Sequence, residues 1–215
     1  MQTISVLNQK GGVGKTTIAT SLAAAAHLAG LRTGILDLDE QGSGLDWYAA
    51  RGPVSKLDGL TVVGSARTLT LAKFREMSRG FDVMVCDGPP RIGDVTRAAA
   101  VAADVVVIPL RPGVFDWWAS AETLAILDSA DEIRAALGMA PSRRVFVVNG
   151  AAHGTRTLGA ALDALRDLGT IAPTIGNRVA FASDAAAGES VLTLHAGSAA
   201  ASEITALWNV VRGVA

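Results

Sequence analysis

The fold is indicated by one stretch near the start of the chain, Ile4-Ser5-Val6-Leu7-Asn8-Gln9-Lys10-Gly11-Gly12-Val13-Gly14-Lys15-Thr16-Thr17. A short apolar run leads into a glycine-rich segment, and an alanine-rich segment of helical period follows over residues 16–28. This order predicts a buried strand, a tight loop and a helix. Glycines let the loop backbone curl around an anion with its N–H groups pointing inward. The stretch therefore predicts a phosphate-binding loop.

Five further apolar runs, also short and rich in β-branched residues, lie at residues 33–36, 60–63, 83–86, 105–108 and 145–148. Such runs are typical of strands that are buried on both faces. Segments of helical period lie between them, for example residues 69–78, 119–137 and 158–168. Alternating strands and helices favour right-handed crossovers and a mostly parallel sheet. We expect an α/β fold of three layers, with helices on both faces, in a single domain over residues 1–215.

Composition excludes several kinds of site. The formal net charge of -1 over 215 residues is not the signature of a nucleic-acid-binding chain, so DNA binding would need a local basic patch. Cys86 is the single cysteine, which excludes an internal disulfide and fits a reducing compartment. No apolar stretch reaches the roughly 20 residues that cross a bilayer, and the first residues lack a basic export signal. We expect a cytoplasmic protein.

Polar residues and one proline stand at or just past the ends of the apolar runs: Asn8, Asp37, Asp39, Asp87, Pro109 and Asn149. In a parallel sheet the carboxyl ends of the strands meet at one edge, where ligands collect. We therefore expect these residues to surround the phosphate-binding loop. Helix N-caps are the alternative interpretation of the aspartates, and a turn is the alternative for Asn149.

The loop itself carries two further signals. The ammonium group of Lys15 would lie between the β- and γ-phosphates of ATP, and the hydroxyl of Thr16 is the expected protein ligand of Mg²⁺. Gln9 stands where the common Walker pattern has its first glycine, and Lys10 is an additional lysine. A glycine-rich turn that only caps a helix is the competing interpretation, but the order of strand, loop, lysine, hydroxyl and helix argues against it.

These residues resemble a known family. The segment from Lys10 to Thr16 looks like the deviant Walker A motif of the ParA/MinD family of P-loop ATPases. Similar to further family motifs are Asp37-Leu38-Asp39-Glu40-Gln41, Val85-Cys86-Asp87-Gly88-Pro89-Pro90, Pro109-Leu110-Arg111-Pro112, Val147-Val148-Asn149 and Ile175-Gly176-Asn177-Arg178. Glu40, Gly88 and Gly176 depart from the family pattern. The resemblance covers almost the whole chain and implies the three-layer P-loop NTPase fold.

The resemblance implies roles for the residues that match. The phosphates would be bound by the loop, Gly11, Gly12, Val13, Gly14, Lys15, Thr16 and Thr17. Lys10 would reach across an ATP-dependent homodimer to the phosphates of the partner's ATP. Asp39 would orient the attacking water and lie near Mg²⁺, while Asp37 and Asp87 would hold water bound to Mg²⁺. Asn149, with the backbone of Ile175, Asn177 and Arg178, would contact the adenine. Trp117 and Trp118 would belong to the dimer surface or to the core.

Four biological roles are open within the family. The compact ParA-type partition ATPases, which lack an N-terminal helix-turn-helix, bind nonspecific DNA and are stimulated by a small centromere-binding partner. The same machinery positions protein cargo on the nucleoid through an adaptor protein. A MinD-like membrane ATPase would need a basic amphipathic tail, and we expect no membrane contact because Ile204, Leu207, Trp208 and Val211 have the spacing of a packed helix. A nitrogenase-type reductase would need better placed cysteines than Cys86.

DNA contact would depend on arginines in the second half of the chain: Arg143, Arg144, Arg156, Arg166 and Arg178. Solvated arginines that are balanced by neighbouring aspartates are the alternative interpretation. The three histidines, His27, His153 and His195, are scattered and do not have the spacing of metal ligands. We expect ATP and Mg²⁺ as the cofactors. We also expect slow basal hydrolysis of ATP, because machines of this kind need a partner to complete the active geometry.

Overall fold

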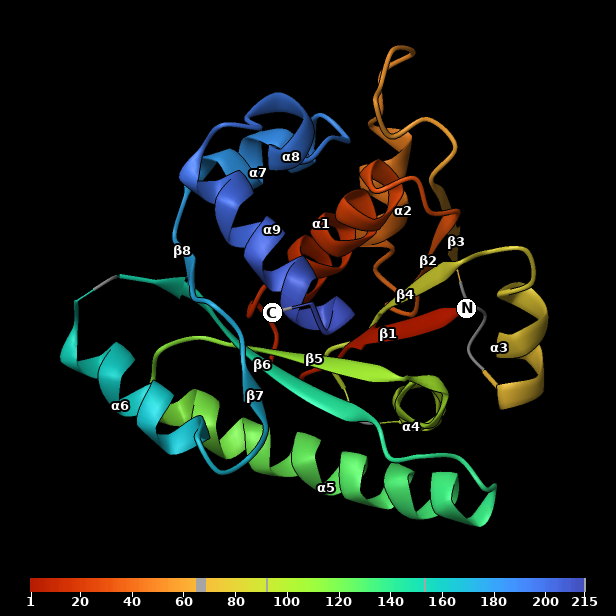
Figure 1. The fold of residues 1–215 in the computed structure, drawn as a ribbon, viewed down its shortest axis with the longest axis vertical. Helices are drawn as coiled ribbons and strands as arrows, with labels where there is room; N and C mark the ends of the chain where they lie inside the picture. Colours follow the sequence, from red (N-terminus) through yellow and green to blue (C-terminus); the bar gives the residue numbers. More distant parts are fainter. Residues whose placement is uncertain (65–68, 92, 153, 215) are drawn as a thin grey trace.

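The computed structural model describes residues 1–64, 69–91, 93–152 and 154–214, with the backbone but not the side chains of residues 114–120. Its strands form one parallel sheet in the order β3-β2-β4-β1-β5-β6-β7, and β8 pairs with the far end of β6 (Figure 1). The strands are β1 (Gln2–Val6), β2 (Thr33–Asp37), β3 (Thr61–Gly64), β4 (Val83–Asp87), β5 (Val105–Leu110), β6 (Arg143–Ala151), β7 (Thr170–Ile171) and β8 (Ile175–Gly176).

Helices cover both faces of the sheet, as Figure 1 shows. The predicted three-layer α/β fold is therefore confirmed. One face packs against α1, α2, α7, α8 and α9, and the other packs against α3, α4, α5 and α6. The helices are α1 (Lys15–Leu28), α2 (Ser43–Ala49), α3 (Leu71–Met77), α4 (Asp94–Ala102), α5 (Val114–Ala136), α6 (Arg156–Leu165), α7 (Val179–Ala186), α8 (Val191–Leu194) and α9 (Ala199–Arg212).

Most residues of the central strands are apolar because each face of the sheet has its own core. Ile4 and Val6 of β1 belong to the core beneath α1 and α9, whereas Met84 and Cys86 of β4 belong to the core beneath α4 and α5. Successive residues of a strand point to opposite faces, so a strand between two helical layers favours apolar residues on both faces. The four apolar positions of the last helix, Ile204, Leu207, Trp208 and Val211, are buried as their spacing predicts.

The register of the central strands brings the ends of β1, β2 and β4 together. Asp87 is the last residue of β4, and it pairs with Val6 of β1 on one side and with Asp37 of β2 on the other. The loop after β1 therefore starts beside both carboxylates. This is the edge at which the sequence predicts a ligand site.

Two residues expected at strand ends lie inside longer strands. Asn149 lies within β6, and Pro109 lies within β5, where it pairs with Val147. Proline is tolerated in this central strand because the pairing of β1 with β5 has ended, and the Pro109 carbonyl instead accepts a hydrogen bond from the Asn8 side chain (2.7 Å). The prediction placed Pro109 and Asn149 at or just past the ends of the apolar runs, and it is corrected because β5 continues to Leu110 and β6 to Ala151.

The single cysteine lies in the core. Cys86 is fully buried, and burial raises the pKa of its thiol to about 12, so the thiol is neutral and inert at neutral pH. No helix in the described ranges is both long and apolar enough to cross a membrane.

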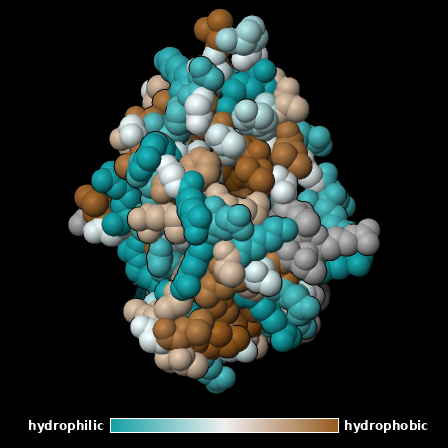
Figure 2. Space-filling view, turned by 90° about the vertical axis from the view of Figure 1, so that its right-hand side faces the viewer, coloured by the Kyte–Doolittle hydropathy of each residue, from teal (hydrophilic) through white to brown (hydrophobic). Residues whose placement is uncertain are grey.

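Figure 2 shows mostly hydrophilic side chains over the middle of one face and an apolar area towards its lower end.

Candidate functional site

The glycine-rich loop between β1 and α1 has an open, curled backbone. Gly12 and Gly14 have φ angles of 74° and 91°, in the left-handed region that favours glycine. A Cβ atom on Gly11 or Gly12 would meet nothing within 4 Å, so the loop borders open space. A Cβ atom on Gly14 would lie 2.2 Å from Nδ2 of Asn149. The loop thus leaves room for an anion on one side and packs tightly against β6 on the other.

Lys15 is the buried cation of this loop. Lys15 is the first residue of α1, and only 7% of it is exposed. Its ammonium group donates to the Lys10 carbonyl at 3.1 Å. Burial lowers the pKa of Lys15, while the carboxylates of Asp87 and Asp39 raise it. The ammonium group is thus bound to the backbone of the glycine loop, and the charges of two carboxylates partly offset its burial. This is a suitable position for binding a phosphate oxygen.

Asp87 is a buried carboxylate that lacks hydrogen-bond donors. The residue is 1% exposed, and within the described part of the chain neither carboxylate oxygen makes a hydrogen bond of ordinary geometry. Burial raises the pKa of Asp87 to about 7, although the nearby Thr16 hydroxyl lowers it in part. Buried polar atoms without partners call for a missing group. The water shell of a Mg²⁺ ion bound beside Thr16 would supply donors to this carboxylate, so the residues present fit that ion.

Asp37 accepts hydrogen bonds at the start of a helix, which is the alternative interpretation given for the aspartates. Its Oδ2 accepts hydrogen bonds from the backbone of Gly44 (2.8 Å) and Leu45 (3.1 Å) at the start of α2, and its Oδ1 accepts one from Asp39 (3.1 Å). Burial raises its pKa, and these three N–H groups lower it in part. Asp37 therefore caps α2. Its proposed contact with water on Mg²⁺ remains a prediction.

Asp39 lies in the turn between β2 and α2 and is partly exposed. Its Oδ1 accepts a hydrogen bond from the backbone of Gln41 at 3.1 Å. Its negative charge raises the pKa of Lys15. Among the residues described, no three histidine, cysteine or acidic side chains form a group that could hold a metal ion. A metal ion here would depend on the Thr16 hydroxyl, ligand oxygens and water rather than on the three aspartates.

The first turn of α1 opens into a groove of about 390 Å³ between α1, α2 and α7. Thr16, Thr17 and Thr20 of α1 form one side, and Asp46 and Trp47 of α2 form another. Because Thr16 and Thr17 also end the glycine loop, the groove continues from the phosphate-binding part of the site. The predicted binding residue Thr17 thus lies beside open space.

The expected adenine residues come together at the end of β6. Asn149 pairs with Ile175 of β8, and its side-chain nitrogen donates to the Val13 carbonyl at 2.7 Å. Asn177 follows β8 and is exposed. The guanidinium of Arg178 pairs with Glu203 of α9 at 2.6 Å, and the same carboxylate accepts from the backbone of Gly176. The segment after β8 is thereby fixed beside the glycine loop.

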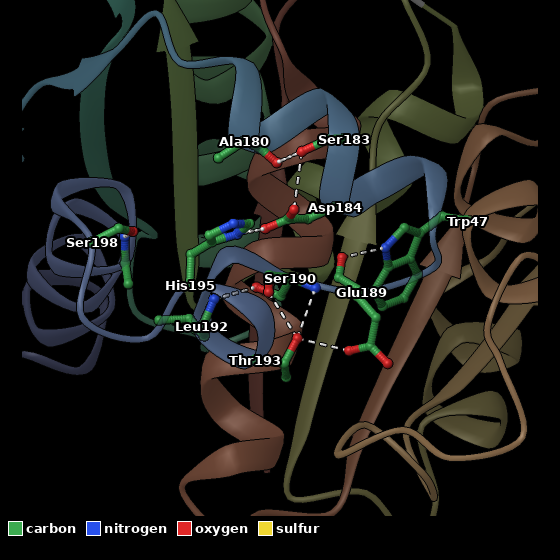
Figure 3. A network of polar contacts seen from close by, with 11 residues as sticks. Trp47, Ala180, Ser183, Asp184, Glu189, Ser190, Leu192, Thr193, His195 and Ser198 are labelled. Carbon is green, nitrogen blue, oxygen red and sulfur yellow. Dashed lines mark hydrogen bonds and ion pairs between the residues drawn. The ribbon is translucent and has the colours of Figure 1, made fainter.

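Helix α2 is joined to the segment between α7 and α8, as Figure 3 shows. The indole nitrogen of Trp47 donates to the Glu189 carbonyl at 3.0 Å, and close by His195 Nδ1 lies 2.8 Å from the buried Asp184 carboxylate. Arg51 extends this connection, because its guanidinium stacks 4.8 Å from the centre of the Trp47 ring. These contacts fix the far side of α2, the helix that follows the turn carrying Asp39.

Four of the five arginines predicted to bind DNA contact acceptors of the chain itself. Arg144 pairs with Asp128 and Asp131, Arg166 pairs with Asp163, Arg178 pairs with Glu203, and Arg143 donates to the Val211 carbonyl. Arg156 is exposed at the first residue of α6. The structure therefore does not gather the five arginines into one open patch. The side chains of Trp117 and Trp118, like His153, lie outside the described residues.

Two contact residues of the loop have no assigned role in the sequence analysis. The side-chain oxygen Oδ1 of Asn8 accepts a hydrogen bond from the Lys10 backbone N–H at 2.9 Å, and Arg111 Nε donates to the Gly12 carbonyl at 3.0 Å. Arg111 lies in a family-like segment, and Asn8 follows the first strand. The positions of Asn8 and Arg111 in the sequence place them near the loop. They do not indicate which backbone group of the loop each side chain contacts.

The fold and this site define a P-loop nucleotide-binding protein, in which a parallel sheet presents a glycine loop and a buried lysine at its carboxyl edge. The chain belongs to the CobQ/CobB/MinD/ParA nucleotide-binding domain family, whose model matches residues 4–191. The resemblance inferred from the motifs is thus confirmed.

Curated relatives include two proteins with stated cellular roles. The chain is 37% identical over 166 residues to the maintenance of carboxysome distribution protein A of Gloeobacter kilaueensis, a match covering 77% of this chain and 69% of that protein. It is 33% identical over 181 residues to the chromosome-partitioning ATPase Soj of Thermus thermophilus, covering 72% and 71%. Among solved structures, the ATP complex of McdA from Cyanothece has a TM-score of 0.79 at 17% identity, over 100% of this chain and 97% of that one.

The substitution Gly14→Ala should destabilise the free protein as well as disturb the loop. Its Cβ would collide with Asn149, and its φ of 91° is strained for alanine, at a cost of about 1–3 kcal/mol. Thermal unfolding without nucleotide measures this effect. Gly11→Ala is the matched control, because its Cβ meets open space and should leave the unfolding midpoint nearly unchanged. Equal midpoints for Gly14→Ala and the natural protein would contradict the packing described here.

Proposed function

We propose that the chain is an ATP hydrolase that dimerises when it binds ATP and partitions DNA with a small centromere-binding partner. The observation that carries the proposal is the curled glycine loop with the buried Lys15, whose ammonium group binds the Lys10 carbonyl of the same loop. The Soj relative, a chromosome-partitioning ATPase by its name, supports the cellular role. ATP and Mg²⁺ are the proposed cofactors, and we propose that residues 1–215 act as a single domain.

Each residue of the site has a task in this proposal. Lys15 and the N–H groups of residues 11–17 would bind the phosphates, and the Thr16 hydroxyl would hold Mg²⁺, whose charge would offset that of the phosphates. Asp87 and Asp37 would accept hydrogen bonds from water on the ion. Asp39 accepts a hydrogen bond from the attacking water and orients it in line with the γ-phosphate.

The adenine is proposed to lie beside β6 and β8. Because Nδ2 of Asn149 donates to the Val13 carbonyl, its amide oxygen is the atom that can accept from the exocyclic amine of the base. The backbone of Ile175, Asn177 and Arg178 closes the other side. The ion pair of Arg178 with Glu203 holds this segment in place, so the Arg178 guanidinium serves the pocket rather than DNA.

A second cation is proposed to come from a neighbouring subunit. Lys10 is half buried directly before the glycines, and its carbonyl already binds Lys15. In the proposed ATP dimer its ammonium group reaches the phosphates of the partner and offsets charge in the transition state, as an arginine finger does. ATP then holds two subunits together, and hydrolysis releases them.

The second candidate is the positioning of a protein cargo on the nucleoid. The carboxysome-distribution relative of Gloeobacter kilaueensis favours it. Both candidates use the same ATP cycle and differ in the adaptor protein. The product of the neighbouring gene therefore distinguishes them: a DNA-binding adaptor supports partition, and a cargo-binding adaptor supports positioning.

Lys10→Ala should retain ATP binding but lose the ATP-dependent dimer, because Lys15 binds the phosphates within the subunit and Lys10 acts on the partner. Calorimetry with MgATP measures the binding, and light scattering with and without MgATP measures the mass. Lys73→Ala, at an exposed position on α3, is the control and should dimerise normally. A Lys10→Ala protein that dimerises like the natural one would refute the action in trans.

Asp39→Ala should slow ATP turnover by about 100-fold or more, since it removes the group that orients water, while binding is kept. The dimer formed with ATP should persist for longer. Steady-state release of phosphate and the lifetime of the dimer are the measurements. Glu76→Ala, at an exposed acidic position on α3, is the control. Unaltered turnover in Asp39→Ala would assign the water to another residue.

Binding of the ATP form to arbitrary duplex DNA should weaken steeply with salt, because phosphate contacts release counterions. Arg156→Ala should reduce the affinity more than Arg166→Ala, because both side chains are exposed but the charge of Arg166 is partly offset by its ion pair with Asp163. Fluorescence anisotropy with a labelled duplex measures both effects. Binding that is absent, or indifferent to salt, would remove DNA from the proposed function.

A further inference from the structure

Arg111 contacts the outer side of the glycine loop. It follows β5 directly, and its Nε donates to the Gly12 carbonyl at 3.0 Å. A Cβ atom on Gly150 would lie 3.9 Å from the guanidinium carbon of Arg111, so the guanidinium lies between the loop and the end of β6.

The next carbonyl of the loop is held in the same way. Asn149 donates to the Val13 carbonyl at 2.7 Å, so side chains from the ends of β5 and β6 bind two successive carbonyl groups. Asn8 anchors the start of the loop, since its side chain binds both the Pro109 carbonyl and the Lys10 N–H. The curl of the loop is thus fixed from its carbonyl side by residues outside the motif.

Binding a carbonyl also orients and polarises the N–H group of the same peptide unit. The Gly12 carbonyl and the Val13 N–H belong to one planar trans peptide and point in opposite directions. A charged donor on the oxygen therefore fixes the N–H away from Arg111 and strengthens it as a donor. The effect of the guanidinium should exceed that of the neutral amide of Asn149.

We propose that Arg111 is a positioning residue for nucleotide binding, which holds the Gly12–Val13 peptide so that its N–H donates to a phosphate oxygen. The inference rests on the proposed function, because it needs the loop to bind a nucleotide. Arg111 acts through the loop backbone and does not itself touch the phosphates. It also links the segment that begins α5 to the phosphate site.

The test compares Arg111→Ala, Arg111→Lys and the natural protein by calorimetry with MgATP and MgADP. Hydrogen bonds to charged groups contribute about 1.5 kcal/mol or more, so Arg111→Ala should bind nucleotide at least roughly tenfold more weakly. Arg111→Lys should recover part of the loss, because it keeps the charge but not the planar fork of donors. Arg75→Ala, at an exposed arginine of α3, is the matched control and should bind normally.

Thermal unfolding without nucleotide separates positioning from a purely structural role. Arg111→Ala with a lowered unfolding midpoint but unchanged affinity for MgATP would overturn the inference. Equal losses of affinity in Arg111→Ala and Arg75→Ala would also overturn it, since the effect would then come from overall charge. If the natural protein itself binds no MgATP, the proposed function fails. If it binds and Arg111→Ala binds equally well, only the role of Arg111 fails.

Discussion

The buried ammonium group of Lys15 is the constraint around which the carboxyl edge of the sheet is arranged. Burial of a charge is costly unless partners compensate it, and here the Lys10 carbonyl and the charges of Asp87 and Asp39 do so. Asp87 is itself desolvated, so each charge depends on the other. This local balance requires the exact register of β1, β2 and β4, and the register in turn depends on the two apolar cores.

The sequence predicted the parts of the fold that repeat a strong pattern. Six strands were predicted because strands buried on both faces are continuous apolar runs. Helices α1, α3, α5 and α6 were predicted from segments of helical period, and the glycine loop has few other interpretations. The short elements β7, β8 and α8 were not predicted, since two to four residues contain no measurable period. The boundaries of β5 and β6 were also wrong, because Pro109 and Asn149 continue the strands through contacts with distant residues.

The candidate site also has some residues that the sequence predicts and others that it does not. The sequence identified the loop, the aspartates and Asn149, because motif spacing and strand ends coincide there. It could not decide between a metal role and a cap for Asp37, since the cap exists only once α2 folds back on it. Arg111 had no visible role because its partner is a backbone carbonyl, which any sequence possesses. Contacts to main chain between distant segments are generally beyond the reach of motif reasoning.

The two-residue strand β7 ends one side of the sheet. An edge strand of this length exposes few unpaired backbone groups, so a second chain finds little main chain to add to. Self-association by extension of the sheet is thereby discouraged at this edge. A contact between two copies of the chain there would depend on side chains and loops rather than on backbone pairing.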